Sequence, residues 1–148
     1  MRIIYHCYGG AHSSVAAAAI HLGLLPLPEP GRDAITALPF FDQHTHMDQG
    51  RLFFYGTDAR GNEVFVLGRA GAAAILERTI RFAFKLTGEG DEILFVNTIP
   101  AVNVWMRVGG FLSRRLGWVR IGRPLVTLGT ELAIPKLASL VERVRERL

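Results

Sequence analysis

Residues 2–23 read RIIYHCYGGAHSSVAAAAIHLG, a strand-like run followed by a glycine turn and an alanine-rich run. The β-branched and aromatic residues at positions 2–8 predict a strand. Gly9 and Gly10 end that strand, and Ser13 or Ser14 can cap the helix that residues 15–24 predict. A strand that turns directly into a helix is the unit from which α/β domains are built, so this segment predicts an α/β fold.

The rest of the chain continues the alternation of strands and helices. Further strands are expected at residues 52–55, 63–67, 92–97 and 124–128, and a turn-rich connector joins the first two as a hairpin. Helices are expected at residues 72–86, around Gly109 and Gly110, and at the end of the chain. This order predicts one α/β domain over residues 1–148, with a mostly parallel three-layer sheet, helices on both faces and one antiparallel hairpin or edge strand.

The amino-acid composition indicates which class of protein the chain belongs to. Hydrophobic residues make up 49% of the chain and charged residues 20%, which is typical of a folded globular domain. No run reaches the about 20 apolar residues of a membrane span, and Met1 and Arg2 lead straight into a strand rather than a secretory signal. We therefore expect a cytoplasmic protein with no membrane partner. Cys7 is the only cysteine, which excludes an internal disulfide and an all-cysteine zinc site.

Positive charge is concentrated in one part of the sequence. The formal net charge is +4, and no acidic residue occurs between Glu92 and Glu131, where the arginines are Arg107, Arg114, Arg115, Arg120 and Arg123. Such a block predicts either a solvated basic face or a surface for an acidic protein or nucleic acid. Trp105, Phe111 and Trp118 interleave with these arginines, as in single-strand binders. A non-enzymatic interaction module that uses the residue 107–123 surface is therefore one alternative.

The loop at residues 7–14 is the strongest candidate for a binding site. In open α/β sheets, ligands collect at the carboxyl ends of the strands, and a helix N-terminus presents unpaired N–H groups to anions. Gly9 and Gly10 allow close approach of the backbone, His12 supplies a proton or a charge, and Ser13 and Ser14 supply hydroxyls. We expect a small anionic, phosphate-containing ligand here. The pattern names no cofactor and no oligomeric state.

Two further residues are expected to line the same site. Asn97 follows the strand at residues 92–97, and Thr130 follows the strand at residues 124–128. The carboxyl ends of parallel strands lie at one edge of a sheet, so both side chains are expected near the residue 7–14 loop.

Residues 8–16 resemble a shortened form of the phosphate-binding loop of partitioning ATPases. The resemblance implies anion binding, but the loop is shorter by one residue and His12 replaces the lysine. No aspartate stands at Asn97 or Thr127 as a magnesium ligand. Because lysine and metal carry ATP hydrolysis, we do not expect that reaction.

Cys7 has two interpretations. A cysteine at a strand end before a helix N-terminus can act as a nucleophile, with His12 as its partner in catalysis. Low-molecular-weight phosphatases and the phosphocarriers of sugar transport use this layout. Ser13 occupies the position of the phosphatase arginine, which argues against phosphatase chemistry, whereas a phosphocarrier needs no such arginine. The alternative is that Cys7 is a small buried residue that ends a strand.

His44 and His46 form a second candidate site. Two histidines separated by one residue project to the same side of an extended segment, and with Asp48 and Asp42 they can hold a transition metal. A metal-dependent hydrolase that uses His44 and His46 is therefore the second alternative. The competing interpretation is a polar loop with solvated histidines.

Residues 2–23 also resemble the start of an uncharacterised bacterial family, domain-of-unknown-function family 3189, found in endospore-forming Firmicutes and their relatives. Further matching stretches are residues 56–58, 61–62, 66–68, 109–114, 122–126 and 129–130. The resemblance implies a bacterial cytoplasmic protein without an assigned activity. The cluster at residues 44–48 is not part of the resemblance.

Overall fold

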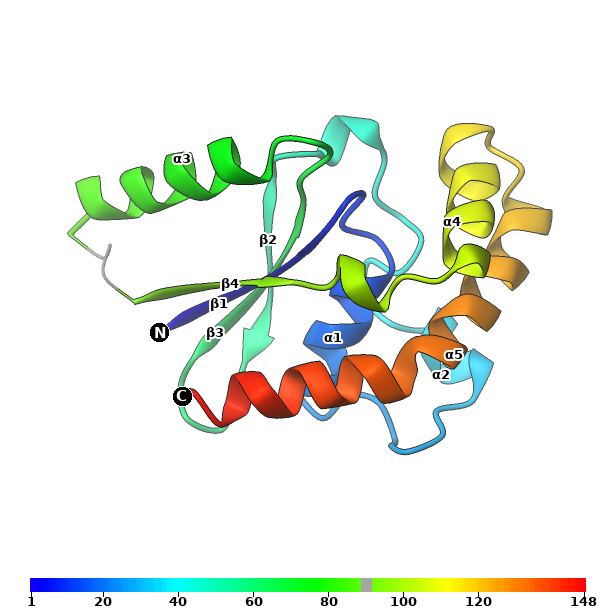
Figure 1. The fold of residues 1–148 in the computed structure, drawn as a ribbon, viewed down its shortest axis with the longest axis horizontal. Helices are drawn as coiled ribbons and strands as arrows, with labels where there is room; N and C mark the ends of the chain where they lie inside the picture. Colours follow the sequence, from blue (N-terminus) through cyan, green and yellow to red (C-terminus); the bar gives the residue numbers. More distant parts are fainter. Residues whose placement is uncertain (89–91) are drawn as a thin grey trace.

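A computed structural model describes residues 1–88 and 92–148. Its sheet has the strand order β2-β3-β1-β4. The strands are β1 (Arg2–Cys7), β2 (Leu52–Thr57), β3 (Glu63–Gly68) and β4 (Ile93–Asn97). β1 runs parallel to β3 and β4, and β2 pairs antiparallel with β3 at the edge of the sheet (Figure 1). The mostly parallel sheet with one antiparallel hairpin is therefore confirmed.

β1 is the central strand because it is apolar on both faces. Ile3 and Tyr5 belong to the core on one face of the sheet, while Ile4 belongs to the core on the other. A parallel strand covered on both sides requires such an uninterrupted apolar run. The pairing also aligns the strand ends, because Cys7 lies opposite Gly68 and His6 lies opposite Asn97. The carboxyl ends of β1, β3 and β4 therefore meet at one edge.

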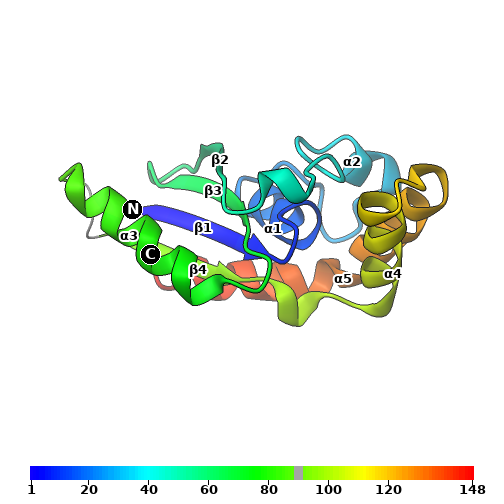
Figure 2. The same cartoon turned by 90° about the horizontal axis from the view of Figure 1, so that it is seen from above.

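Helices cover both faces of the sheet, as expected. α1 (Ser13–His21) and α5 (Val119–Arg145) lie on one face, and α3 (Ala73–Leu86) lies on the opposite face, where its Ile80 and Phe84 pack (Figures 1 and 2). Every residue of α1 is buried. Its alanines are small enough to let the helix fit between the sheet and α5, with which it shares the main core.

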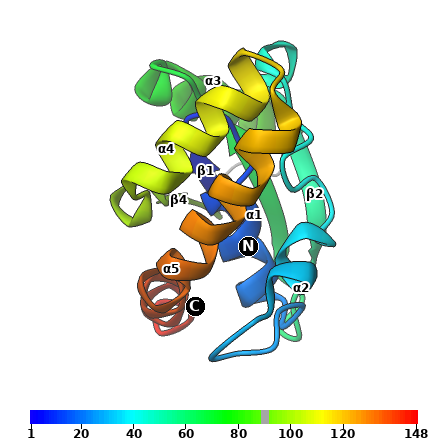
Figure 3. The same cartoon turned by 90° about the vertical axis from the view of Figure 1, so that its right-hand side faces the viewer.

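Short helices fill the connections. They are α2 (Arg32–Thr36), the 3₁₀ turns η1 (His46–Asp48) and η2 (Ile99–Ala101), α4 (Val104–Gly110) and the π-helical turn η3 (Phe111–Arg115). α4 and η3 stand beyond the carboxyl edge of the sheet and pack against the start of α5 (Figures 1 and 3). This position makes them a wall opposite the end of β1.

The strand expected at residues 124–128 is wrong, because these residues lie inside α5. Gly122 and Gly129 bring α5 into backbone contact with α4. A Cβ atom on Gly122 would lie 2.6 Å from the Gly109 carbonyl oxygen, and one on Gly129 would lie 2.6 Å from the Met106 nitrogen. The spacing of Gly122 and Gly129 places both on the same face of a helix. Packing of that face against α4 stabilises the helix and outweighs the preference of residues 124–128 for a strand.

α5 is the one helix in residues 1–88 and 92–148 whose length and apolar character would suffice to cross a membrane. Core helices of water-soluble proteins meet the same criterion. The side chains that α5 buries in the main core include Val126, Ile134, Leu137, Val141 and Val144.

Candidate functional site

The β1–α1 loop folds back on the end of its own strand. Gly10 adopts φ +71° and donates its N–H to Cys7 Sγ at 3.1 Å. A Cβ atom on Gly10 would lie 2.5 Å from the Gly68 nitrogen, so this position accepts only glycine. The Ser14 hydroxyl contacts Cys7 Sγ at 3.3 Å. The sulfur thus has a backbone N–H and a hydroxyl group within hydrogen-bond distance.

A chain of hydroxyl groups fixes the loop to the end of β4. The Thr98 hydroxyl donates to the His6 carbonyl at 3.0 Å and lies 2.9 Å from Ser13 Oγ. Because the Thr98 hydrogen is already committed to His6, the Ser13 hydroxyl is the donor in the second bond. The first residue of α1 is therefore held against the neighbouring strand end.

α1 begins without a cap. His12 stands at the N-cap position without a side-chain hydrogen bond to the helix, and the first turn of α1 contains no acidic residue. The first N–H groups of a helix have no partner inside the helix, and they carry the positive end of its dipole. Within the described chain, the start of α1 has neither of the usual side-chain partners for these groups.

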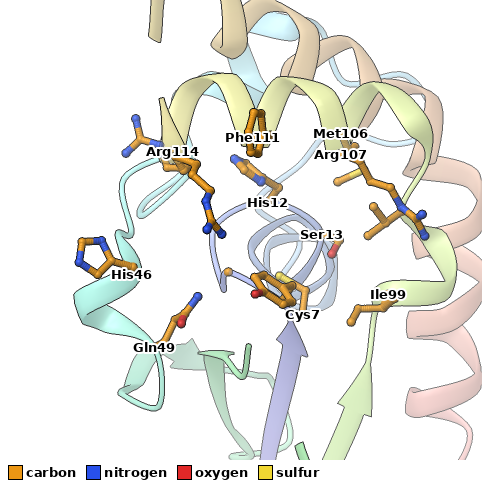
Figure 4. A pocket seen from close by; sticks show the side chains of 15 residues that line it. Cys7, His12, Ser13, His46, Gln49, Ile99, Met106, Arg107, Phe111 and Arg114 are labelled. Carbon is orange, nitrogen blue, oxygen red and sulfur yellow. The ribbon is translucent and has the colours of Figure 1, made fainter. Parts of the chain in front are cut away.

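A cavity of about 840 Å³ lies between this loop and the α4–η3 wall. Its floor is formed by Cys7, Gly9, His12 and Ser13. Arg107, Arg114 and Arg115 belong to the opposite wall, and none of the lining residues that the structure describes is acidic. Figure 4 shows the labelled side chains around the loop. The cavity is therefore electropositive.

Asp42 connects the two walls of this cavity. Its side chain is fully buried. Its Oδ1 accepts a hydrogen bond from His12 Nε2 and forms an ion pair with Arg114 Nε, each at 3.0 Å. Its Oδ2 accepts from the Ser113 hydroxyl at 2.7 Å and from Arg123 Nε at 3.1 Å. One carboxylate thus links the start of α1 to η3 and α5.

The same contacts decide the charge of Asp42. Burial by itself would raise the pKa of this carboxyl, but hydrogen bonds from His12, Ser113 and Arg123, together with the charge of His12, hold the pKa below its ordinary value. Asp42 is therefore ionised at neutral pH and can only accept hydrogen bonds. This assigns a proton to His12 Nε2.

His12 is also confined on its other sides. Its ring makes an edge contact with Phe41, at 5.6 Å between ring centroids. A Cβ atom on Gly110 of α4 would lie 3.1 Å from His12 Cε1, so the wall packs closely against the ring at this position. The imidazole consequently has a fixed orientation at the floor of the cavity.

The residue 107–123 arginine block does not form one uniform surface. Arg114 and Arg123 are paired with Asp42, and Arg114 also lines the cavity together with Arg107 and Arg115. No ion pair or hydrogen bond of the Arg107 or Arg115 guanidinium is found within the described residues. Arg120 is exposed at the start of α5.

The structure brings most of the expected loop residues together, in two groups. Cys7, Gly9, His12 and Ser13 line the cavity. Gly10 and Ser14 are buried behind them, where they contact Cys7 Sγ. The Gly10 N–H and the Ser14 hydroxyl thus position Cys7, and neither residue lines the cavity.

Asn97 and Thr130 are not lining residues. Asn97 ends β4 as expected, but its Oδ1 accepts from the Ile99 N–H at 3.1 Å, and the adjacent Thr98 is the residue that contacts the loop. Thr130 lies inside α5, fully buried, and its hydroxyl donates to the Val126 carbonyl. The expectation that Thr130 follows a strand is wrong because that strand is helical.

The histidine cluster does not converge. His44 is buried, donates from Nδ1 to the Gly10 carbonyl at 2.8 Å and stacks on Phe53. His46 lines the cavity, and Asp48 accepts from Thr45 in the capping box of η1. No group of three or more His, Cys, Asp or Glu side chains positioned for a metal ion is found in the described part of the chain.

The sequence did not predict that Asp42 lies at the centre of the site or that η3 forms part of its wall. The sequence suggested Asp42 only as a metal ligand beside the histidines. The arginine block gives an indirect signal for such a residue. The block contains no acidic residue, so an arginine that is buried there needs a carboxylate partner from elsewhere in the chain.

Comparison with known protein families supports the resemblance seen in the sequence. Residues 2–146 match the family described as Protein of unknown function (DUF3189). The chain belongs to this family. No curated protein and no solved structure matches the chain. The DUF3189 match spans β1, the loop and the α4–η3 wall, so the whole cavity lies within the family domain.

Replacing Asp42 with asparagine is expected to destabilise the domain. The Asp42→Asn change removes the charge that pairs with Arg114 and Arg123, and the loss should be about 3 kcal/mol, the lower end for breaking a buried ion pair, because Arg123 is partly exposed to water. Urea unfolding at neutral pH measures this loss of unfolding free energy. Asp33→Asn, an exposed carboxylate on α2, is the matched control and should change little.

The stability difference between wild type and Asp42→Asn should depend on pH. Because the pKa of Asp42 is lowered in the folded state, its stabilising contribution is complete above the unfolded value of about 3.9 and is lost as the pH falls below it. The two unfolding free energies should therefore converge in acid. A difference that is constant from neutral to acid pH would contradict the ionised Asp42.

Proposed function

We propose that the chain binds a small phosphate-containing ligand in the cavity and holds the phosphate at the residue 7–14 loop. The observation that carries the proposal is the arrangement of the cavity. The uncapped start of α1 lies at its floor, Arg107, Arg114 and Arg115 line it, and no carboxylate is found among its described lining residues. Such a site attracts anions and excludes cations.

Each group at the floor has a role in this proposal. The first N–H groups of α1 donate to the phosphate oxygens. Gly9 leaves space for the ligand, since no atom lies within 4 Å of the position a Cβ atom would occupy. His12, with its Nε2 bonded to Asp42, presents its other ring edge as a donor or acceptor. Arg107 and Arg115 supply charge that no carboxylate in the described chain neutralises.

The alternatives have weaker support. A nucleic acid or acidic protein bound across the residue 107–123 block would rely on charges that Asp42 partly neutralises at Arg114 and Arg123. A metal-dependent hydrolase would need His44 and His46 to point toward one metal ion, whereas His44 donates a hydrogen bond to the Gly10 carbonyl. The cavity between the loop and the α4–η3 wall therefore favours a small ligand.

Inorganic phosphate should raise the melting temperature of the purified protein, because a ligand that binds only the folded state stabilises it in proportion to the logarithm of its concentration. The measurement is a thermal unfolding series in phosphate at constant ionic strength set with sodium chloride. The double variant Arg107→Ala/Arg115→Ala should lose most of this rise, since it removes two cations from the cavity and no structural ion pair seen in the described chain.

The matched control is Arg143→Ala/Arg147→Ala, which removes the same charge from the exposed C-terminal end of the chain. It should keep the phosphate response of wild type. A melting temperature that responds equally to phosphate and chloride in the wild type would overturn the proposal. So would a response that both double variants retain.

A second candidate function is phosphoryl transfer through Cys7, and the contacts of the sulfur favour it. The Gly10 N–H and the Ser14 hydroxyl, both within hydrogen-bond distance of Sγ, suit a thiolate. The thiolate attacks phosphorus, the phosphorus–oxygen bond to the ester breaks, and the leaving alcohol takes a proton. An acceptor hydroxyl group then attacks the phosphocysteine, loses its proton and takes the phosphoryl group, and the sulfur–phosphorus bond breaks to restore the thiolate.

This chemistry is tested with 4-nitrophenyl phosphate. We expect release of nitrophenol, a phosphoryl group on Cys7 after acid quenching, detected by intact mass spectrometry, and loss of both in Cys7→Ser. Cys7 is the only cysteine, so a thiol adduct has one possible position. If Cys7→Ser released nitrophenol as fast as the wild type, Cys7 would be only a wall of the cavity.

A further inference from the structure

The cavity is larger than a phosphate ion requires. Its volume of about 840 Å³ falls within the range of about 300–1,000 Å³ of pockets that enclose drug-sized ligands. A phosphate at the residue 7–14 loop would occupy only the part next to the floor. The residues around the remaining volume therefore indicate which ester group the ligand carries.

The two sides of the loop differ in polarity. Figure 4 shows Ile99 and Met106 on one side of the loop, with Arg107 beside them, and His46 and Gln49 on the other. Val102 adds to the aliphatic lining. An aliphatic surface offers no partner for hydroxyl groups, so a sugar placed there would lose hydrogen bonds to water without replacement. This side of the cavity suits an apolar group.

Two aromatic side chains at the cavity are exposed. Tyr8 follows β1 and is 57% exposed, and Phe111 opens η3 and is 51% exposed, although both line the cavity. By contrast, Phe41 next to His12 is 2% exposed. Tyr8 belongs to the loop and Phe111 to the opposite wall, so a planar ring between the walls would cover both and gain aromatic contacts.

We propose that the ligand is a phosphate ester of an aromatic ring, with the phosphate at the residue 7–14 loop and the ring against Tyr8, Phe111 and the aliphatic side of the cavity. This inference rests on the proposed phosphate site and adds the class of ester. A free phosphate or a polyhydroxy ester would leave the aromatic and aliphatic lining uncovered.

The test compares three ligands by isothermal titration of the full chain: inorganic phosphate, glycerol phosphate and phenyl phosphate. Phenyl phosphate should bind roughly 10-fold more tightly than glycerol phosphate, because its ring is removed from water and contacts Tyr8 and Phe111. Phe111→Ala should remove most of this preference, measured as the ratio of the two affinities. Phe82→Ala, an exposed phenylalanine on α3 outside the cavity lining, is the matched control and should behave as wild type.

The outcomes separate the two proposals. If all three ligands bind equally, or glycerol phosphate binds best, the aromatic ester is wrong and the phosphate site stands. If Phe111→Ala and Phe82→Ala change the preference equally, Phe111 has no role in it and the inference fails. If none of the three ligands binds, the phosphate site itself is wrong and the inference falls with it.

Discussion

The buried carboxylate of Asp42 is the interaction on which the site depends. An ionised carboxylate without water is stable only when its oxygens are paired, and Asp42 meets this requirement with His12, Ser113, Arg114 and Arg123. These partners belong to the start of α1, to η3 and to α5, so the carboxylate fixes the floor and the wall of the cavity relative to each other. The loop and the arginines therefore line the same cavity.

Most of the fold was predictable because its signals are local. The run at residues 2–8, the hairpin connector and the apolar stripe of the last helix each specify their own element, and β1, β2, β3, β4 and α3 lie close to where they were expected. The prediction of a strand at residues 124–128 was wrong because a contact between distant parts of the chain decides the structure there. Its residues have β preference, but Gly122 and Gly129 allow backbone contact with α4, and that contact exists only in the folded chain.

The candidate site also has one part that was predictable from local sequence and one part that was not. The residue 7–14 loop was predictable because a glycine turn between a strand and a helix is a local pattern, and Cys7, Gly9, His12 and Ser13 do line the cavity. Asp42 was not, because its partners lie 30 residues before it at His12 and 81 after it at Arg123. The arginine block was visible, yet a sequence does not show which of its charges a distant carboxylate will pair.

The central claim is that the Asp42 carboxylate holds His12 at the floor of the cavity. Long-range nitrogen–proton correlation NMR of the His12 ring tests it most directly. We expect a protonated Nε2 whose hydrogen exchanges slowly and whose resonance shifts in Asp42→Asn, with the histidines outside the Asp42 contacts unchanged. An unprotonated Nε2, or a His12 signal that Asp42→Asn leaves in place, would contradict it.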